Sequence, residues 1–213
     1  MGKLRIDTLT LGAMATNCYL AMNKETKRSI IIDPGDEPER VIRKMEDLDG
    51  VPEAILLTHG HFDHIGAAQA LQEHYSGAGI QIPICALREE LAICESPSDN
   101  LSAMFGAGYT VRLDRLFEDN EEPAFAGVKV KVLHTPGHTA GGACYYIEEE
   151  KTLFSGDTLF CCSVGRTDFP TGSMAQLGNA IHTRLFVLPE DTLVLPGHGE
   201  STSIGYEKKY NPY

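Results

Sequence analysis

The chain has 213 residues, of which 42% are hydrophobic, and it carries a formal net charge of −12. This length and composition allow one substantial hydrophobic core, so we expect a single domain over residues 1–213. The acidic balance argues against a protein that binds nucleic acid, because that affinity rests largely on clustered lysine and arginine.

No apolar run approaches the roughly 20 residues that span a bilayer, and residues 1–12 lack the apolar region of a signal peptide. The sequence therefore predicts a cytoplasmic protein with no membrane partner. Its six cysteines show no zinc-ribbon spacing, and the adjacent Cys161 and Cys162 are poorly suited to bonding each other. Reduced thiols are therefore expected.

The first part of the chain alternates predicted strands with turns and helices. Apolar runs bounded by turn residues predict strands over residues 4–12, 17–23, 28–35, 53–58 and 82–86. Helical spacing predicts helices over residues 37–47, 65–75 and 88–95. The segment LLTHGHFDHIGA, residues 56–67, therefore lies where a buried strand ends and a helix begins.

Strand patterns return in the second part of the chain, from about Gly127 onward. They cover residues 128–139, 142–149, 152–160 and 192–199, with an amphipathic helix predicted over 173–188. Strands in two batches, each accompanied by helices, predict an α/β fold in which two sheets pack together with helices outside. Such a fold is a four-layer αββα sandwich.

Three histidines and an aspartate are crowded into residues 59–64. Each of these side chains resists burial without a partner, and a metal would satisfy all of them. His59 and His61 alternate and could hold one ion, whereas Asp63 and His64 could serve a second. Imidazole and carboxylate suit zinc, and also iron or manganese, while the lack of a nearby cysteine argues against a closed structural zinc site.

Three later loops repeat this arrangement of a polar residue behind an apolar run. His138 lies in HTPGHTAGG, Asp157 in FSGDTLF and His198 in LPGHGES. The adjacent glycines let the backbone turn sharply, so we expect these side chains to share one cleft with residues 59–64. For His138 alone, a hydrogen-bonded loop histidine is the alternative. Three further histidines lack such a context and are interpreted as surface residues: His74, His134 and His182.

The order T-H-x-H-x-D-H, G-H-T, S-G-D-T-L-F and P-G-H-G resembles the metallo-β-lactamase-fold superfamily over nearly the whole chain. Together with SVGRTDFPTGS at 163–173 and the tail SIGYEKKYNPY, it is most similar to the short glyoxalase II-type hydrolases. The resemblance implies the αββα metallo-β-lactamase sandwich, with Asp63 and Asp157 as catalytic residues. It implies two metal ions: a first held by His59, His61 and His138, and a second held by Asp63, His64 and His198, with Asp157 bridging both.

The implied reaction is hydrolysis of a small anionic thioester, such as S-lactoylglutathione, by a hydroxide shared between two divalent ions, with zinc favoured over iron or manganese. Tyr145 and Arg166 match segments that hold the glutathione part of the substrate. The alternatives are a strand core residue for Tyr145 and a pair with Asp168 for Arg166. Asp33 resembles an acid that orients a ligand histidine through its free N–H, or it simply forms an Asp-Pro-Gly turn.

Two departures and one rival reaction bear on the substrate. The chain ends at EKKYNPY without the helical C-terminal extension of full-length glyoxalase II, which leaves other small anionic thioesters open as substrates. Asp157 stands near the place where class B lactamases typically carry cysteine, which counts against β-lactam hydrolysis. G-R-T-D-F at 165–169 also resembles the persulfide dioxygenases, which use a single iron, but DFP and PGHGES differ from the DFQ and PAHDY of that branch. Hydrolysis is predicted, with persulfide dioxygenase as the alternative.

Overall fold

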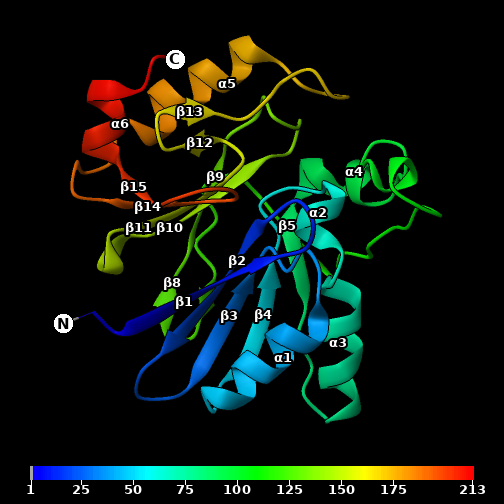
Figure 1. Ribbon diagram of the computed structural model, residues 1–213. Coiled ribbons are helices and arrows are strands. Elements are labelled where there is room, and N and C mark those ends of the chain that lie inside the picture. Colours follow the sequence, from blue (N-terminus) through cyan, green and yellow to red (C-terminus); the bar gives the residue numbers. More distant parts are fainter. Residues whose placement is uncertain (1) are drawn as a thin grey trace.

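The computed structural model describes residues 2–213, and two large sheets face each other in it (Figure 1). The first sheet has the strand order β1-β2-β3-β4-β5-β6, with the bounds Leu4–Leu11, Thr16–Asn23, Arg28–Ile32, Val51–Leu56, Ile84–Leu87 and Arg115–Phe117. The second has the order β15-β14-β11-β10-β9, with the bounds Thr202–Ser203, Leu193–Pro196, Thr152–Gly156, Ala143–Ile147 and Lys131–His134. Two small hairpins accompany them: β7 (Ala124–Phe125) with β8 (Val128–Lys129), and β12 (Leu159–Phe160) with β13 (Ser163–Val164).

Helices cover the outer face of each sheet, as Figure 1 shows. Those beside the first sheet are α1 (Pro38–Asp47) and α3 (Ala68–Gly77), and those beside the second are α5 (Met174–Ala180), a π-helical turn (Ile181–Leu185) and α6 (Ile204–Tyr210). Shorter helices and 3₁₀ turns lie between strands of one sheet: α2 (Phe62–Ile65), η1 (Arg88–Glu90), α4 (Leu91–Cys94) and η2 (Ser102–Met104) in the first, and η3 (Glu148–Glu150) in the second. The predicted four-layer αββα sandwich is confirmed.

A shared apolar core joins the inner faces of the two sheets. Tyr19 of the first sheet and Phe154 of the second lie with ring centroids 5.3 Å apart. Ile30, Phe117 and Tyr145 belong to the same buried cluster. Because apolar area removed from water is the main stabilising term, this core holds the two sheets together face to face.

The strand directions gather several strand ends at one edge. Strands β3, β4, β5 and β6 run parallel, and β11 pairs in parallel with β14. In open α/β sheets, the crevice outside the carboxyl ends of parallel strands is where ligands bind. The loops after β3, β4, β11 and β14 are therefore brought to one region.

The structure differs from the predicted elements mainly where elements are short. The helix expected over 65–75 is two helices, since α2 begins at Phe62 and ends before α3. The tail that follows Ser203 forms α6, with the Ser203 hydroxyl accepting a hydrogen bond from the Tyr206 N–H as an N-cap. Within residues 2–213, no helix combines the length and the apolar character needed to cross a bilayer.

Candidate metal centre

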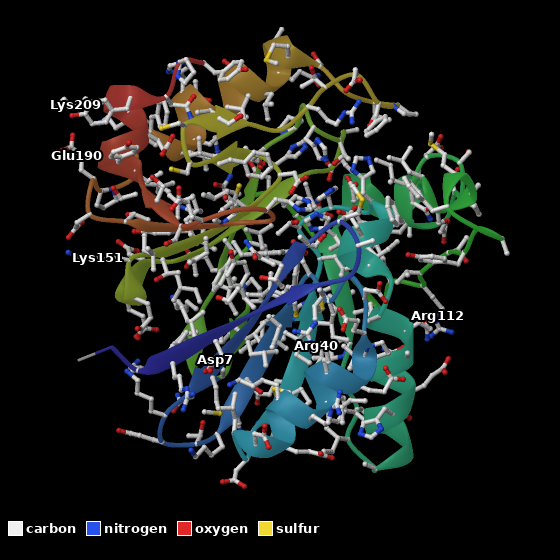
Figure 2. The ribbon with its side chains drawn as sticks, viewed as in Figure 1. Asp7, Arg40, Arg112, Lys151, Glu190 and Lys209 are labelled. Atoms are coloured by element: carbon white, nitrogen blue, oxygen red, sulfur yellow. The ribbon has the colours of Figure 1, made fainter. Side chains whose placement is uncertain are left out.

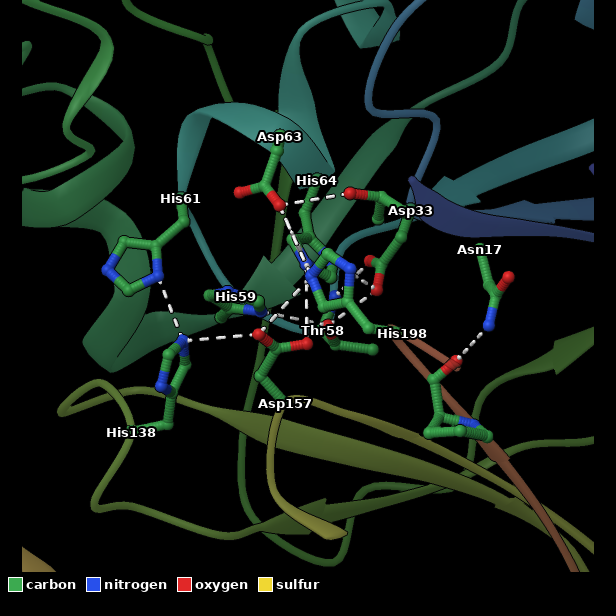
Figure 3. Close-up of polar contacts among 12 residues, drawn as sticks. Asn17, Asp33, Thr58, His59, His61, Asp63, His64, His138, Asp157 and His198 are labelled. Atoms are coloured by element: carbon green, nitrogen blue, oxygen red, sulfur yellow. Dashed lines mark hydrogen bonds and ion pairs between the residues drawn. The ribbon is translucent and has the colours of Figure 1, made fainter. Parts of the chain in front are cut away.

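The seven side chains predicted to bind metal lie together at the carboxyl ends of strands (Figure 3). His59 and His61 follow β4, Asp63 and His64 belong to α2, and the others follow β9, β11 and β14 in the order His138, Asp157 and His198. Their donor atoms form three overlapping groups, in each of which all atoms lie within 4.8 Å of one another: His59, His61 and His138; His59, His64 and Asp157; and Asp63, His64 and His198.

Separations within these groups suit a small metal ion. His138 Nε2 lies 2.9 Å from His61 Nδ1, and His198 Nε2 lies 3.3 Å from Asp63 Oδ2 and 3.4 Å from His64 Nε2. Nitrogen and oxygen ligands bind zinc at about 2.0–2.1 Å, which places tetrahedral neighbours about 3.3 Å apart. The donor atoms are therefore already spaced as ligands.

Asp157 lies between the two sets of histidines. Its Oδ2 is 3.7 Å from His138 Nε2 and 3.6 Å from His198 Nε2, while its Oδ1 is 3.4 Å from His64 Nε2. Gly197 makes room for this carboxylate, because a Cβ there would lie 2.2 Å from Asp157 Oδ1. One carboxylate thus lies beside both the group of His59, His61 and His138 and the group of Asp63, His64 and His198, which we call the two donor groups.

Unpaired buried atoms show that the cluster fits a metal. Of the donor atoms in the cluster, His59 Nε2 and Asp157 Oδ1 are buried without a hydrogen-bond partner. Such orphaned atoms are costly and rare in folded proteins. Because the other ring nitrogen of His59 already faces Thr58 Oγ1 at 3.1 Å, Nε2 is the nitrogen left for a metal. The residues present fit a divalent metal centre.

Asp33 orients two of the histidines from behind. It is 2% exposed and follows β3 with φ +50°. Its Oδ2 accepts hydrogen bonds from His64 Nδ1, at 2.9 Å, and from Thr58 Oγ1, at 2.6 Å. Thr58 Oγ1 in turn lies 3.1 Å from His59 Nδ1, so Asp33 orients His59 through Thr58. A carboxylate that fixes the tautomer of ligand histidines is a common feature of metal sites.

The third histidine is oriented by a backbone carbonyl. His138 Nδ1 lies 2.7 Å from the carbonyl oxygen of Arg166, so Nδ1–H donates and Nε2 is free to bind a metal. The Arg166 guanidinium forms a two-point pair with Asp168, with both distances 2.6 Å, and lies over the Phe169 ring. The predicted alternative, a pair with Asp168, is thus present, while the Arg166 side chain stays 57% exposed.

Tyr145 is corrected by the structure, because its side chain is not available to a substrate. It is completely buried between the sheets, and its hydroxyl donates to the Leu57 carbonyl at 2.7 Å. The other three histidines lie outside the cluster: His74 and His182 are exposed and His134 is half-buried.

Burial and charge set the protonation of the cluster. Burial, helped by the His138 imidazole, lowers the pKa of His61 to about 3, and burial also lowers the pKa of His59 well below its ordinary value. For His64, burial opposes the charged form, but carboxylates led by Asp157 outweigh it and raise the pKa well above its usual range. Burial alone would raise the pKa of Asp157, yet the His64 charge lowers it to about 2. The Asp157 carboxylate is therefore ionised, and a metal cation could take the place of the proton that it stabilises on His64.

Two supporting contacts were not predicted from the sequence. Glu90 is fully buried, and its carboxylate accepts hydrogen bonds from the Gly60 N–H at 2.8 Å and from Thr139 Oγ1 at 3.0 Å. Gly60 separates His59 from His61, and Thr139 follows His138. Glu90 therefore ties the first two ligand loops together.

The other contact ties the first sheet to the last ligand loop. Asn17 Nδ2 donates to the carbonyl oxygens of Pro196, at 3.1 Å, and Gly199, at 2.9 Å. The Tyr19 hydroxyl donates to the same Pro196 oxygen at 2.6 Å. These bonds surround His198 on both sides, so strand β2 positions a ligand that the second sheet supplies.

A cavity of about 460 Å³ adjoins the cluster at Asp63. Its walls are mainly apolar and aromatic, and Phe62 and Phe105 stack with ring centroids 4.3 Å apart. Asp36 and Asp63 are its charged lining residues, and no lysine or arginine of residues 2–213 lines it. The cavity offers room for a small molecule beside the metal ligands.

Comparisons with known proteins agree with this geometry. The chain is 37% identical over 213 residues to hydroxyacylglutathione hydrolase GloC of Haemophilus influenzae, covering 99% of this chain and 98% of that protein. It is 37% identical to the solved structure of the BLEG-1 B3 metallo-β-lactamase, with a TM-score of 0.91 and 98% of each chain covered.

Two further solved structures are similar to this chain, and one of them holds metal. TTHA1623 in a di-iron-bound form is 37% identical, with a TM-score of 0.85 and 97% and 98% of the two chains covered. ETHE1 from Myxococcus xanthus is 30% identical, with a TM-score of 0.78 and 98% and 83% covered. The family profile of the metallo-beta-lactamase superfamily matches residues 11–198, a span that includes all seven clustered side chains. The chain therefore belongs to the metallo-β-lactamase superfamily, whose fold implies divalent metal ions.

Proposed function

We propose that the protein is a binuclear metal hydrolase of the glyoxalase II type that cleaves a small thioester such as S-lactoylglutathione. The observation that carries this proposal is the position of Asp157, whose two oxygens lie 3.4–3.7 Å from ligands of both donor groups. The 37% identity to GloC over nearly the whole chain supports the thioester as substrate. Zinc is our favoured metal, and the di-iron neighbour makes iron the first alternative.

The residues divide the work of this reaction. When bound, two divalent ions would lower the pKa of a shared water molecule toward 7 and polarise the thioester carbonyl. Asp157 holds the two donor groups at a fixed spacing. Asp63 Oδ2 accepts a hydrogen bond from Thr16 Oγ1 at 2.9 Å, which leaves Oδ1 to take the proton of the attacking water. Asp63 also lines the cavity, where the substrate would lie.

We assign the uncharged and the anionic parts of the substrate to different regions of the site. The cavity beside Asp63 is apolar and acidic, so it suits an uncharged part of the substrate. Arg166, whose backbone carbonyl contacts His138, has an exposed guanidinium that we assign to an anionic part of the substrate. A thiolate leaving group needs little protonation, which fits a site whose clustered acids are metal ligands.

Persulfide dioxygenase is the second candidate, favoured by the resemblance of residues 165–169 to the G-R-T-D-F segment of that branch. The test compares thiol release from S-lactoylglutathione under anaerobic conditions with oxygen uptake on glutathione persulfide, alongside metal analysis. A cephalosporin is included because a solved structure with 37% identity is described as a B3 metallo-β-lactamase. Two metals per chain with oxygen-independent thioester cleavage would support the proposal. One iron with oxygen uptake and no cleavage would overturn it.

A further inference from the structure

A second group of potential metal ligands lies outside the metal centre, on the β12–β13 hairpin. Cys161 and Cys162 form its two-residue turn, between Phe160 and Ser163, which pair with each other. One donor atom from each cysteine and one from Glu207 of α6 lie within 4.8 Å of one another. Figure 1 shows this hairpin beside α6, on the outer side of the second sheet.

The backbone holds both thiols near this carboxylate. Cys162 has φ +53°, a left-handed conformation that is uncommon for residues other than glycine. Its N–H donates to Glu207 Oε2 at 2.9 Å, and its Sγ lies 3.7 Å from the Tyr206 hydroxyl. A strained backbone conformation persists where surrounding contacts hold it. Here the hydrogen bond from Cys162 to Glu207 holds the left-handed conformation.

Glu207 is a fully buried carboxylate whose position is set in advance. Besides Cys162, it accepts hydrogen bonds from Thr202 Oγ1, at 2.5 Å, and from Asn211 Nδ2, at 2.8 Å. A carboxylate offers about four lone-pair sites, so three bonds leave capacity for a cation. The negative charge therefore faces the two thiols from a rigid support.

The geometry of adjacent residues disfavours a disulfide between Cys161 and Cys162. Adjacent Cα atoms are about 3.8 Å apart across a trans peptide, whereas disulfides usually need about 4.4–6.8 Å. The Glu207 carboxylate beside the two thiols instead favours a cation.

We propose that Cys161, Cys162 and Glu207 form a second metal site, which takes a thiophilic divalent cation such as cadmium or zinc. Two thiols lose their protons to solvent and form two metal–sulfur bonds, and Glu207 supplies the third ligand. With metal–sulfur distances of about 2.3 Å, tetrahedral donors lie about 4 Å apart, so the three groups need to close by less than about 1 Å. The proposal is independent of the thioester reaction, because the catalytic ligands contain no sulfur.

Cadmium chloride alone is the probe, added to the reduced full-length protein. Thiolate-to-cadmium charge transfer in the ultraviolet reports sulfur ligation, to which the metal centre contributes nothing. We expect the signal to saturate at one cadmium per chain, and cadmium to protect both thiols from alkylation. Cys161→Ser and Cys162→Ser should each remove it, whereas Asp157→Asn, in the metal centre, should retain it.

Serine replaces a half-buried and an exposed thiol here, so both variants should fold, and their thermal unfolding checks this. The four buried cysteines are the internal control, because a charge-transfer signal that survives in both serine variants would come from them: Cys18, Cys85, Cys94 and Cys144. That result would overturn the site. So would the absence of a signal below millimolar cadmium.

Discussion

Glu90 Oε1 accepts a 2.8 Å hydrogen bond from the backbone N–H of Gly60, although the two residues are thirty positions apart. The contact is buried, and it fixes the peptide that separates His59 from His61. A fully buried carboxyl that serves a ligand loop makes the stability of this protein sensitive to pH.

Glu90→Gln should flatten the pH dependence of stability. Burial raises the pKa of Glu90 from 4.5 to about 7, so folding takes up a proton between these values and stability falls as pH rises through them. The loss amounts to about 3 kcal/mol across the window. Urea unfolding from pH 4.5 to 8 should show this slope in the wild type and in Glu89→Gln, an exposed neighbour, but not in Glu90→Gln. Parallel slopes in all three proteins would contradict the assignment.

Asp157→Ala should remove metal and activity together. The carboxylate contacts both donor groups, so its loss should leave at most one metal per chain and reduce kcat/KM by more than about 100-fold. Metal analysis and thioester kinetics on the same sample check this. Asp191→Ala removes an exposed aspartate paired with Lys151 and should retain both metal and activity. Full metal and full activity in Asp157→Ala would exclude the bridge.

Asp33→Asn should weaken metal binding without removing a ligand. The substitution disturbs the hydrogen bonds that orient His64 directly and His59 through Thr58, and such losses cost about 10–100-fold in metal affinity. Competition with a chromogenic chelator measures the affinity. Asp47→Asn, on the exposed side of α1, is the matched control. An unchanged affinity would assign Asp33 to the turn alone.

Arg166→Ala should raise KM for an anionic thioester while kcat changes little, because the guanidinium would hold substrate and the backbone carbonyl would still orient His138. Arg112→Ala is the control, since that side chain is 85% exposed and lies at the periphery of the molecule (Figure 2). If KM stays constant while stability falls, the pair with Asp168 is structural, and Asp168→Ala should then cause the same loss.

Tyr145→Phe should affect stability only. Loss of the hydroxyl leaves the buried Leu57 carbonyl without this donor, which costs about 1–2 kcal/mol. Chemical denaturation gives the free energy of unfolding, and steady-state kinetics should give a wild-type KM. A selective rise in KM would restore Tyr145 as a substrate contact.

The metal cluster could be predicted because its signals are local. Each ligand follows an apolar run, and glycine stands near the turn, as at Gly197 beside His198. The strand ends then converge through the parallel pairing of β11 with β14. An apolar run followed by a polar residue can be recognised in the sequence without knowing which strand lies beside it.

Tyr145 and Glu90 could not be placed in this way. All five residues of β10 are buried, because both faces of this strand are covered, so alternation does not show that Tyr145 faces the core between the sheets while Tyr146 faces the helices. Glu90 is charged in a short helical segment, where exposure is the ordinary expectation. Its burial depends on Gly60 and Thr139, which are distant in sequence.

The bonds from Asn17 and Tyr19 to the loop that carries His198 have a consequence for how the protein matures. During synthesis, His59, His61, Asp63 and His64 leave the ribosome well before His138, Asp157 and His198 have been made. The position formed by Asp63, His64 and His198 is not complete until the loop after β14 has docked on β2. Metal uptake at that position therefore requires the second half of the chain to have docked on the first, so the order in which the two positions fill is set by folding.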